Sequence, residues 1–193
     1  RRLLELSCDP VCPPKLLEAA RKLLPEFVEK TGEYICLSTL RGSSRSIVLR
    51  YNSTHQVQGK ESTALIEENP YSSASGRLLL ALLDDGRRDF CLRQLRPPGK
   101  LWPEMHSRKG LDKALDKLRG EKMACFSKGE LSTLATSLYH KGKAFALGVF
   151  VPNYRFQGEH KMKIFKMLIE ISSKIEEADS KTRGIRKNQT GAI

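Results

Sequence analysis

Apolar side chains recur at intervals of three and four residues along several stretches of the chain. This spacing places them on one face of an α-helix. The first long stretch begins at Pro13-Pro14 and ends at Gly32, and Pro25 inside it can kink the helix. Four further segments show the same pattern, and we expect helices over residues 73–83, 84–95, 107–120 and 158–178.

Shorter runs rich in β-branched and aromatic residues lie between these segments and indicate strands. Residues 52–69 are polar and predict only weak strands and loop, while the turns at 42–44 and 140–142 join neighbouring strands as hairpins. This order of elements predicts an α+β domain, with a mostly antiparallel sheet and helices packed on it. We expect strands over residues 34–40, 47–51, 122–126, 131–139 and 143–151.

The stretch from Pro70 to Leu83 is a loop of small residues that leads directly into an apolar helix. Ser72 or Ser73 can act as the N-cap, because a short hydroxyl accepts a hydrogen bond from a first-turn N–H group. The remaining N–H groups and the positive end of the helix dipole favour a carboxylate or another anion at this point. Gly76 lets the helix approach a neighbouring backbone closely. An ordinary capped helix without a ligand fits the same residues, so both interpretations stay open.

Length and composition fit one domain: the chain has 193 residues, of which 39% are hydrophobic. No apolar run approaches the ~18–20 residues of a membrane span, and no secretion leader is recognisable. Five cysteines, an odd number, favour reduced thiols over a disulfide framework. We therefore expect a cytoplasmic protein that does not enter a membrane.

The chain is strongly basic, with a net charge of +12 and a pI near 9.6. Such a protein is attracted to polyanions, above all to nucleic acid. Most of its lysines and arginines, however, alternate with acidic residues at helical spacing, which is typical of solvated helix faces. A basic nucleic-acid-binding module is therefore one hypothesis, but the charge does not locate a binding site.

Cysteine and histidine positions give little support to a metal site or an enzyme. Cys8 and Cys12 lack a second Cys/His pair at ligand spacing, so we expect neither a metal nor another cofactor. Cys36 and Cys125 lie in predicted strands and suit small core residues. A GAF-fold reductase that uses cysteine chemistry is a rival hypothesis, and it needs an accessible thiol of low pKa. Hydrolase and nucleotide-binding motifs are absent from the sequence.

Several motifs occur in an order that resembles a known family. Thr-Gly-Glu at 31–33 enters the first strand, and after the hairpin and the polar segment Ser-Ala-Ser-Gly-Arg at 73–77 opens an apolar helix. Together with the helical segment 111–119 and the last hairpin, this order resembles the effector-binding domain of IclR-family transcriptional regulators. The similarity covers roughly residues 1–178. It implies a GAF-like fold, a central antiparallel sheet flanked by helices.

The resemblance implies a sensor and not an enzyme. Residues 1–12 would be the end of a linker helix from an N-terminal winged helix-turn-helix that this chain lacks. Residues 13–178 would form the effector-binding and oligomerisation domain, and residues 179–193 a basic flexible tail. The implied partners are a small-molecule effector, further copies of the chain in a dimer or tetramer, and DNA through the missing domain.

The resemblance also implies a ligand site at the start of the central helix, over Ser73, Ala74, Ser75 and Gly76. In the family, backbone N–H groups hold a ligand carboxylate, and the matching groups here belong to Ala74 and Ser75. We expect the side chain of Ser75 to lie at the anion end of this pocket.

Other pocket positions of the family are only partly polar in this chain. Thr133 matches a small polar residue on the first strand of the last hairpin, and Val149 and Val151 match polar positions on its second strand. Ala124 falls where the family usually has an acidic residue. The loss of these polar groups removes hydrogen bonds that would orient a hydrophilic acid. The pocket therefore either accepts a more apolar ligand or has none.

Overall fold

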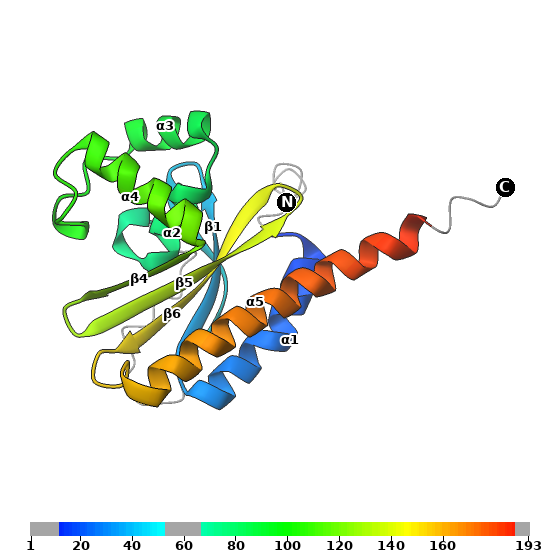
Figure 1. Ribbon diagram of the computed structural model, residues 1–193. Coiled ribbons are helices and arrows are strands. Elements are labelled where there is room, and N and C mark those ends of the chain that lie inside the picture. The colour runs from blue at the N-terminus through cyan, green and yellow to red at the C-terminus, as the bar shows by residue number, and fades with distance from the viewer. Residues whose placement is uncertain (1–11, 53–66, 188–193) are drawn as a thin grey trace, which may run out of the picture.

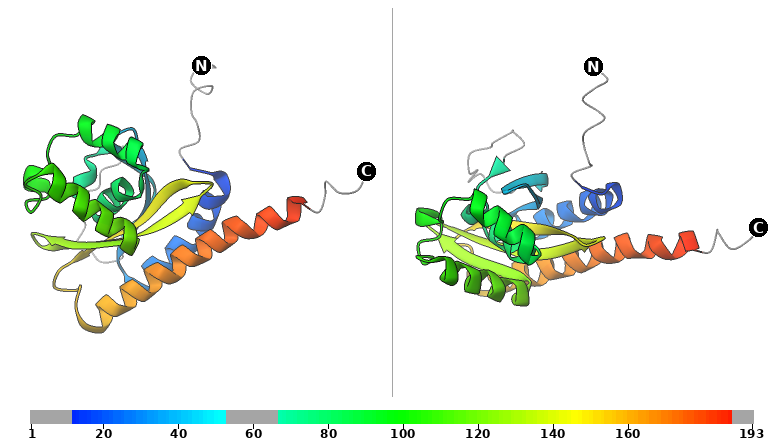
Figure 2. Two further views of the ribbon diagram at one scale, coloured as in Figure 1. Left: turned by 45° about the horizontal axis from the view of Figure 1, so that its top comes forward. Right: turned by 90° about the horizontal axis from the view of Figure 1, so that it is seen from above.

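One antiparallel sheet with helices on both of its faces forms the described part of the protein (Figure 1, Figure 2). The computed structural model describes residues 12–52 and 67–187. The predicted α+β class with a central antiparallel sheet is therefore confirmed. Nearly all of the predicted linker-helix end at 1–12 and most of the polar segment 52–69 lie outside the described residues.

The helices follow the apolar periodicity of the sequence closely. Two short 3-10 helices, η1 and η2, precede α2 and α4. The helical elements are α1 (Pro14–Thr31), η1 (Pro70–Ser72), α2 (Ala74–Leu82), α3 (Asp85–Gln94), η2 (Gly99–Leu101), α4 (Arg108–Glu121) and α5 (Gly158–Lys187).

Within the described residues the sheet has six strands in the order β3-β2-β1-β6-β5-β4. Each pair is antiparallel, so the chain builds the sheet from hairpins. Lys141 (φ 48°) and Gly142 (φ 79°) form the turn of the last hairpin, where two left-handed residues match the twist of the flanking strands. The strands are β1 (Tyr34–Arg41), β2 (Ser44–Tyr51), β3 (Glu67–Glu68), β4 (Met123–Lys128), β5 (Leu131–His140) and β6 (Lys143–Pro152).

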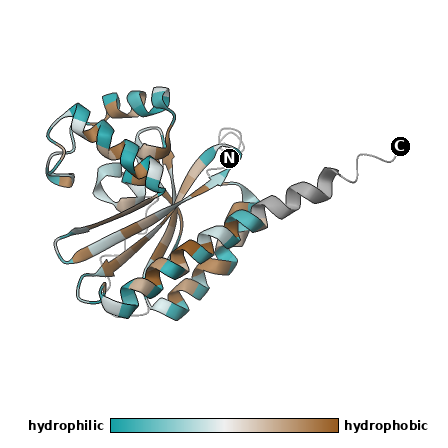
Figure 3. Ribbon diagram, viewed as in Figure 1, coloured by the Kyte–Doolittle hydropathy of each residue, from teal (hydrophilic) through white to brown (hydrophobic). Residues whose placement is uncertain are grey.

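The main hydrophobic core lies between the sheet and the pair α1 and α5, which run side by side along one face (Figure 1, Figure 3). Gly32 follows the last residue of α1 in the left-handed conformation (φ 73°), which lets the chain turn directly into β1. Burial of these apolar groups is the chief stabilising term of the domain. Fully or almost fully buried members of this core include Leu16, Leu24, Phe27, Leu134, Leu147, Val149, Ile164, Leu168 and Ile171.

A buried ion pair ties the start of β1 to the segment that leads into α5. The Glu33 side chain is 0% exposed and accepts two hydrogen bonds from Arg155, Nε to Oε1 at 2.9 Å and Nη2 to Oε2 at 2.7 Å. His160 Nε2 lies 2.9 Å from the same Oε1. A buried carboxylate needs such partners, because an unpaired charge in the interior is costly.

Helix α2 packs on the opposite face of the sheet and close to the turn before it. A Cβ atom added to Gly76 would lie 2.2 Å from the Pro70 carbonyl oxygen, so only glycine fits there. The predicted close backbone approach is confirmed, and the neighbouring backbone is that of η1.

Three predicted helix starts are confirmed by capping hydrogen bonds. Ser73 accepts from the Gly76 N–H at 3.2 Å, Asp84 from the Arg87 N–H and Ser107 from the Gly110 N–H. The serine and aspartate positions therefore marked these helix starts correctly from local chemistry alone.

Two predicted helix ends are wrong. Helix α4 continues past Gly120 and ends at Glu121, with Lys122 in the left-handed conformation. Helix α5 continues past Ala178 to Lys187, so residues 179–187 are helical. Once a helix has formed, each further residue adds a hydrogen bond, and Lys and Arg favour the helix. None of the described helices combines the length and the apolar character that a membrane span requires.

Candidate functional site

The candidate site begins at the first turn of α2, where two backbone N–H groups follow the Ser73 cap. Ser73 is extended (φ −139°), and its Oγ and carbonyl oxygen accept from the N–H groups of Gly76 and Arg77. Within the described residues, no hydrogen bond involves the N–H of Ala74 or Ser75. Both residues are almost fully buried, at 1% exposure. Free N–H groups at a helix start, together with the helix dipole, favour an anion.

Beneath this turn, the sheet presents a row of small side chains. Residues that pair directly across antiparallel strands share one face, which places four residues from β4, β5, β6 and β1 side by side. A Cβ atom on Gly148 would lie 3.1 Å from Ser75 Oγ and 3.3 Å from Cys36 Sγ, so α2 rests directly on this row. We call Ala124, Ala135, Gly148 and Cys36 the small row.

The next row along the same strands is aromatic. Tyr34 and Phe150 meet edge to face with ring centroids 5.4 Å apart. The three aromatic rings are only partly buried, whereas Thr133 is 5% exposed and carries the one hydroxyl at the centre of the row. Part of this apolar surface therefore remains exposed to solvent beside the small row. We call Phe126, Thr133, Phe150 and Tyr34, in strand order, the aromatic row.

Arg45 of β2 brings a positive charge to the same face. The residue is fully buried, and its Nη2 lies 3.2 Å from Cys36 Sγ. Its guanidinium carbon lies 6.0 Å from the centre of the Phe150 ring. Because Phe150 belongs to β6, the side chain of Arg45 crosses β1 to reach the edge of both rows. Desolvation raises the pKa of the neighbouring Tyr34 phenol, whereas the charge of Arg45 opposes that rise.

Arg77 of α2 lies at the β4 end of the aromatic row. Its guanidinium carbon lies 3.5 Å from the centre of the Phe126 ring and 4.1 Å from that of Trp102. Its Nε and Nη2 donate to the carbonyl oxygens of Tyr71 and Leu101 at 3.0 and 2.7 Å. Burial lowers the pKa of Arg77 to about 10, so the side chain remains charged at neutral pH. Arg77 thus binds η1 and η2 to α2 and fixes the position of Phe126.

The structure brings together most of the residues that the sequence assigned to a site. Ser73, Ala74 and Ser75 form the start of α2, and Ala124 and Thr133 lie on the sheet face that α2 covers. Gly76 stands beside them, but the space of its missing side chain faces Pro70 and not the rows.

Val149 and Val151 do not belong to this site, and that assignment is wrong. Both valines lie in the core between the sheet and the helices α1 and α5. Successive side chains of a strand point to opposite faces, so a shift of one residue transfers every side chain to the other side. The residues of β6 that face α2 are Gly148 and Phe150.

Arg45 was missed in the sequence because it lies between the predicted turn at 42–44 and the predicted strand at 47–51. An arginine close to a strand of apolar residues was the only sequence feature that could have indicated it. Its burial depends on the pairing of β1 with β2, where the register shifts between Leu37 and Ser38.

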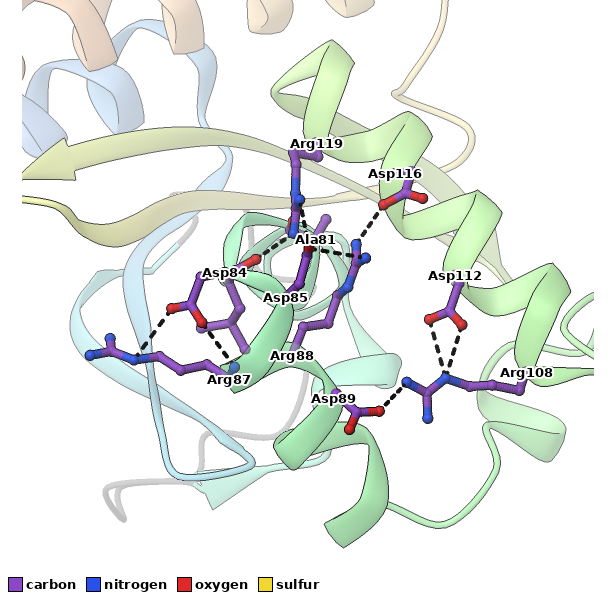
Figure 4. A network of polar contacts seen from close by, with 11 residues as sticks. Ala81, Asp84, Asp85, Arg87, Arg88, Asp89, Arg108, Asp112, Asp116 and Arg119 are labelled. Carbon is purple, nitrogen blue, oxygen red and sulfur yellow. Dashed lines mark hydrogen bonds and ion pairs between the residues drawn. The ribbon is translucent and has the colours of Figure 1, made fainter.

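The far end of α2 is held by Arg119 of α4 (Figure 4). Arg119 Nε donates to the Ala81 carbonyl oxygen at 2.7 Å, and Nη2 donates to that of Leu83. Its Nη1 lies 3.0 Å from the Asp85 carboxylate. A cation at the last carbonyls of a helix satisfies them and is favoured by the helix dipole.

Further ion pairs join α3 to α4 (Figure 4). Arg88 lies 2.6 Å from Asp116, and Arg108 lies 2.8 Å from Asp89. Within α4, Arg108 also lies 3.0 Å from Asp112. Hydrogen bonds from these arginines lower the pKa of Asp116 and of Asp89. Much of the positive charge on this surface is therefore paired with carboxylates, as the alternation in the sequence indicated. This pairing does not favour a binding surface for nucleic acid.

The described cysteines do not form an enzyme centre. Cys36 is fully buried, and desolvation raises the pKa of the Cys125 thiol, which is the opposite of what a reactive cysteine needs. Within the described residues, no group of three or more His, Cys, Asp and Glu side chains is placed to hold a metal ion. The cysteine-based reductase is therefore not supported.

Solved structures share the fold of this chain. A transcriptional regulator from Rhodococcus sp. RHA1 matches with a TM-score of 0.73 and 21% identity, over 86% of this chain and 69% of that one. IclR of Thermotoga maritima matches with a TM-score of 0.71 and 17% identity, over 84% of this chain and 67% of that one. The C-terminal domain of KdgR from E. coli matches with a TM-score of 0.69 and 20% identity, over 85% of this chain and 98% of that one. This chain thus matches nearly all of a C-terminal domain that was solved alone.

The amino-acid sequence identifies the family to which the chain belongs. No curated protein matches the chain, but the family described as bacterial transcriptional regulator IclR, C-terminal, matches residues 13–177. This range spans α1 to most of α5 and contains the start of α2 and both rows of the sheet. The chain therefore belongs to the IclR family of bacterial transcriptional regulators, and residues 13–177 form its C-terminal, effector-binding domain.

Proposed function

We propose that this domain senses a small organic molecule that binds between the first turn of α2 and the aromatic row. The observation that carries the proposal is the pair of buried N–H groups of Ala74 and Ser75, which have no acceptor among the described residues. They stand over a sheet face whose aromatic rings are partly exposed. Specific sites for small molecules combine a mainly apolar lining with a few fixed polar groups in this way.

The domain would act in the cytoplasm as part of a longer regulator and not as an enzyme. DNA would be bound by a winged helix-turn-helix that precedes this domain in the longer protein, and a second copy would pair with it through these domains. Ligand binding would then change the placement of two DNA-binding domains relative to each other. Such coupling requires that the ligand prefer one arrangement over the other.

The aromatic row limits the ligand that this site would accept. Thr133 carries its only aliphatic hydroxyl, and its other members are Phe126, Phe150 and the partly buried Tyr34. A polyhydroxylated ligand would leave most of its hydroxyl groups without partners on this surface, and an unpaired buried hydroxyl is costly. The proposed ligand is therefore compact and largely apolar, with one polar end.

A thermal-shift screen of small aliphatic and aromatic acids, amides and alcohols tests the proposal. A ligand that binds only the folded state raises the midpoint in proportion to its occupancy. For each hit, amide shifts in ¹H–¹⁵N NMR spectra locate the site. We expect the largest changes at the N–H groups of Ala74 and Ser75. A hit whose largest changes fall on α1 or α5 would contradict this location.

A variant pair gives an independent check. Ser75→Glu places a carboxylate at the start of α2, which would repel an acidic ligand and occupy its position. Ser173→Glu makes the same change at an exposed position of α5 and serves as the matched control. We expect the first variant to lose ligand binding and the second to retain it. Equal affinity in both variants would show that Ser75 is not at the ligand.

A further inference from the structure

We propose that the outer side of α5 and the neighbouring edge strand β4 form a docking surface for an acidic amphipathic helix of another protein. This surface lies on the face of the sheet opposite to the start of α2. The inference is therefore independent of the proposed ligand site.

Among the described elements, the helices on this face do not cover β4. Helix α1 packs on β1 and β2 and α5 packs on β5, while β4 is the edge strand beyond β5 (Figure 1). Cys125 pairs with Leu134 of the main core and therefore points to the same face. Cys125 and Ser127 are nevertheless exposed, and Met123 is only partly buried. The face is thus left open along β4, beside α5.

Helix α5 borders this open strand with large apolar side chains. Met162 and Ile169 lie about two turns apart on its outer side and are 67% and 48% exposed. Phe165, between them, is partly buried and stacks on Phe156 with ring centroids 5.9 Å apart. Single exposed apolar side chains are ordinary, but a contiguous group marks an interaction site. We call Met123, Cys125, Met162, Phe165 and Ile169 the edge surface.

Lysines without a carboxylate partner border the edge surface. Lys161 Nζ lies 5.2 Å from the centre of the Phe156 ring. Partial desolvation raises the pKa of the Cys125 thiol, and the charge of Lys161 opposes this rise, so Lys161 lies close to β4. Three further exposed lysines lie on α5 and at the two ends of β4: Lys166, Lys122 and Lys128. Within the described residues none of the four forms an ion pair, whereas arginines of α3 and α4 do.

This charge decides between the possible occupants. A second copy that placed the same surface against this one would bring its own lysines opposite these, and like charges across an interface are unfavourable. Lysines on an edge strand also hinder its pairing with another copy. An amphipathic helix, in contrast, buries apolar residues spaced by three and four in such a surface. Glutamates that flank this stripe would pair with Lys161 and Lys166, so an acidic helix fits both the apolar and the charged parts.

A matched pair of peptides tests the inference on the unaltered chain. Each peptide has about 18 residues, enough to form a helix, with leucines along one face. The flanking positions are glutamate in one peptide and lysine in the other. By fluorescence anisotropy, the glutamate peptide should bind at least about tenfold more tightly than the lysine peptide, and its affinity should fall as salt is added. Amide shifts in ¹H–¹⁵N NMR spectra should be largest in β4 and α5.

One variant pair tests the apolar part of the edge surface. Ile169→Asp places a charge in the apolar stripe and should weaken binding of the glutamate peptide at least about tenfold. Phe90→Asp makes a similar change at an exposed apolar residue of α3 and should leave the affinity unchanged. Both side chains are exposed, so both variants should fold, which circular dichroism checks.

A second variant pair tests the charge. The double variant Lys161→Glu with Lys166→Glu should reverse the preference between the two peptides. Lys109→Glu with Lys113→Glu, at exposed positions of α4, changes the net charge equally and should retain the preference. Reversal in both double variants would mean that the net charge of the chain and not the edge surface selects the peptide, and would refute the inference.

The remaining outcomes are equally decisive. The inference is refuted if both peptides bind equally, if neither binds, or if the largest shifts fall outside β4 and α5. Sedimentation may not show self-association that Ile169→Asp abolishes, since the surface would then join two copies of the chain. Vesicles of phosphatidylglycerol and phosphatidylcholine provide the last control. If they bind the unaltered chain but not Ile169→Asp, the surface contacts lipid and the assignment to an acidic protein helix is wrong.

Discussion

Replacement of Gly76 by alanine probes the contact on which the position of α2 depends. The added Cβ would lie 2.2, 2.7 and 2.8 Å from the carbonyl oxygen, Cα and carbonyl carbon of Pro70. Optimal contacts between nonbonded carbon atoms are about 3.5–4.0 Å, so the closest approach is more than about 1 Å too short. All three atoms are backbone, and no side-chain rotation can relieve the overlap.

The expected loss of stability follows from the hydrogen bonds that hold η1 in place. The segment η1 is held by hydrogen bonds from the Tyr71 N–H to Asn69 and from Arg77 Nε to the Tyr71 carbonyl oxygen, both at 3.0 Å. Displacement of η1 strains or breaks them, and overpacking of this kind typically costs about 1–3 kcal/mol or more. We expect Gly76→Ala to lower the free energy of unfolding by about 3 kcal/mol. In a domain of this size the midpoint would fall by roughly 6–12 °C.

Urea denaturation followed by circular dichroism measures this change, and Gly120→Ala is the matched control. Gly120 lies in α4, and a Cβ atom added there meets nothing within 4 Å. Because alanine favours a helix over glycine, the control should be stabilised by up to about 1 kcal/mol. If Gly76→Ala costs less than about 1 kcal/mol at an unchanged m value, the argument from the Pro70 contact is wrong.

Three further substitutions test the polar contacts. Glu33→Gln leaves Arg155 without its buried counter-charge and should cost about 3 kcal/mol in urea denaturation, whereas a neutral result would mean that this ion pair adds no stability. Arg119→Met removes the donors that hold the end of α2 and should cost about 1–2 kcal/mol, with faster amide exchange in α2 as a second readout. For Asp116→Asn the expected loss depends on pH. The pKa of Asp116 is lowered by Arg88, so the stabilisation is present above the ordinary carboxyl pKa and lost as pH falls through the lowered value. The variant should therefore be less stable than the unaltered protein at pH 6, and this difference should shrink as the pH falls below the ordinary carboxyl pKa. A deficit that does not change with pH would contradict this.

Features set by local chemistry were predictable from the sequence. Ser73, Asp84 and Ser107 cap their helices as expected, because a cap depends on hydrogen bonds within a few residues. The hairpin at Lys141-Gly142 and the antiparallel sheet were predictable for the same reason. The position at which α2 begins was predictable too, since its small residues and its cap are adjacent in the chain.

Features set by the pairing of distant strands were not predictable in detail. Residues 147–151 of β6 form a nearly uninterrupted apolar run that is largely buried on both faces, so alternation could not show which residues face α2. The site was therefore assigned to Val149 and Val151 in place of Gly148 and Phe150. Arg45 was missed because its burial results from contacts with β1 and β6, and no local pattern predicts that an arginine will be covered.

Neighbouring residues of one strand lie on opposite faces of the sheet, so substitutions at adjacent positions have different consequences. On β6, Val149 belongs to the main core, whereas its neighbours Gly148 and Phe150 face the start of α2. A change at Val149 would alter the stability of the domain, whereas a change at Phe150 would alter the surface that the proposed function assigns to a small molecule. Ligand preference in such a domain can therefore diverge through alternate residues of one strand while the core on the other side stays intact.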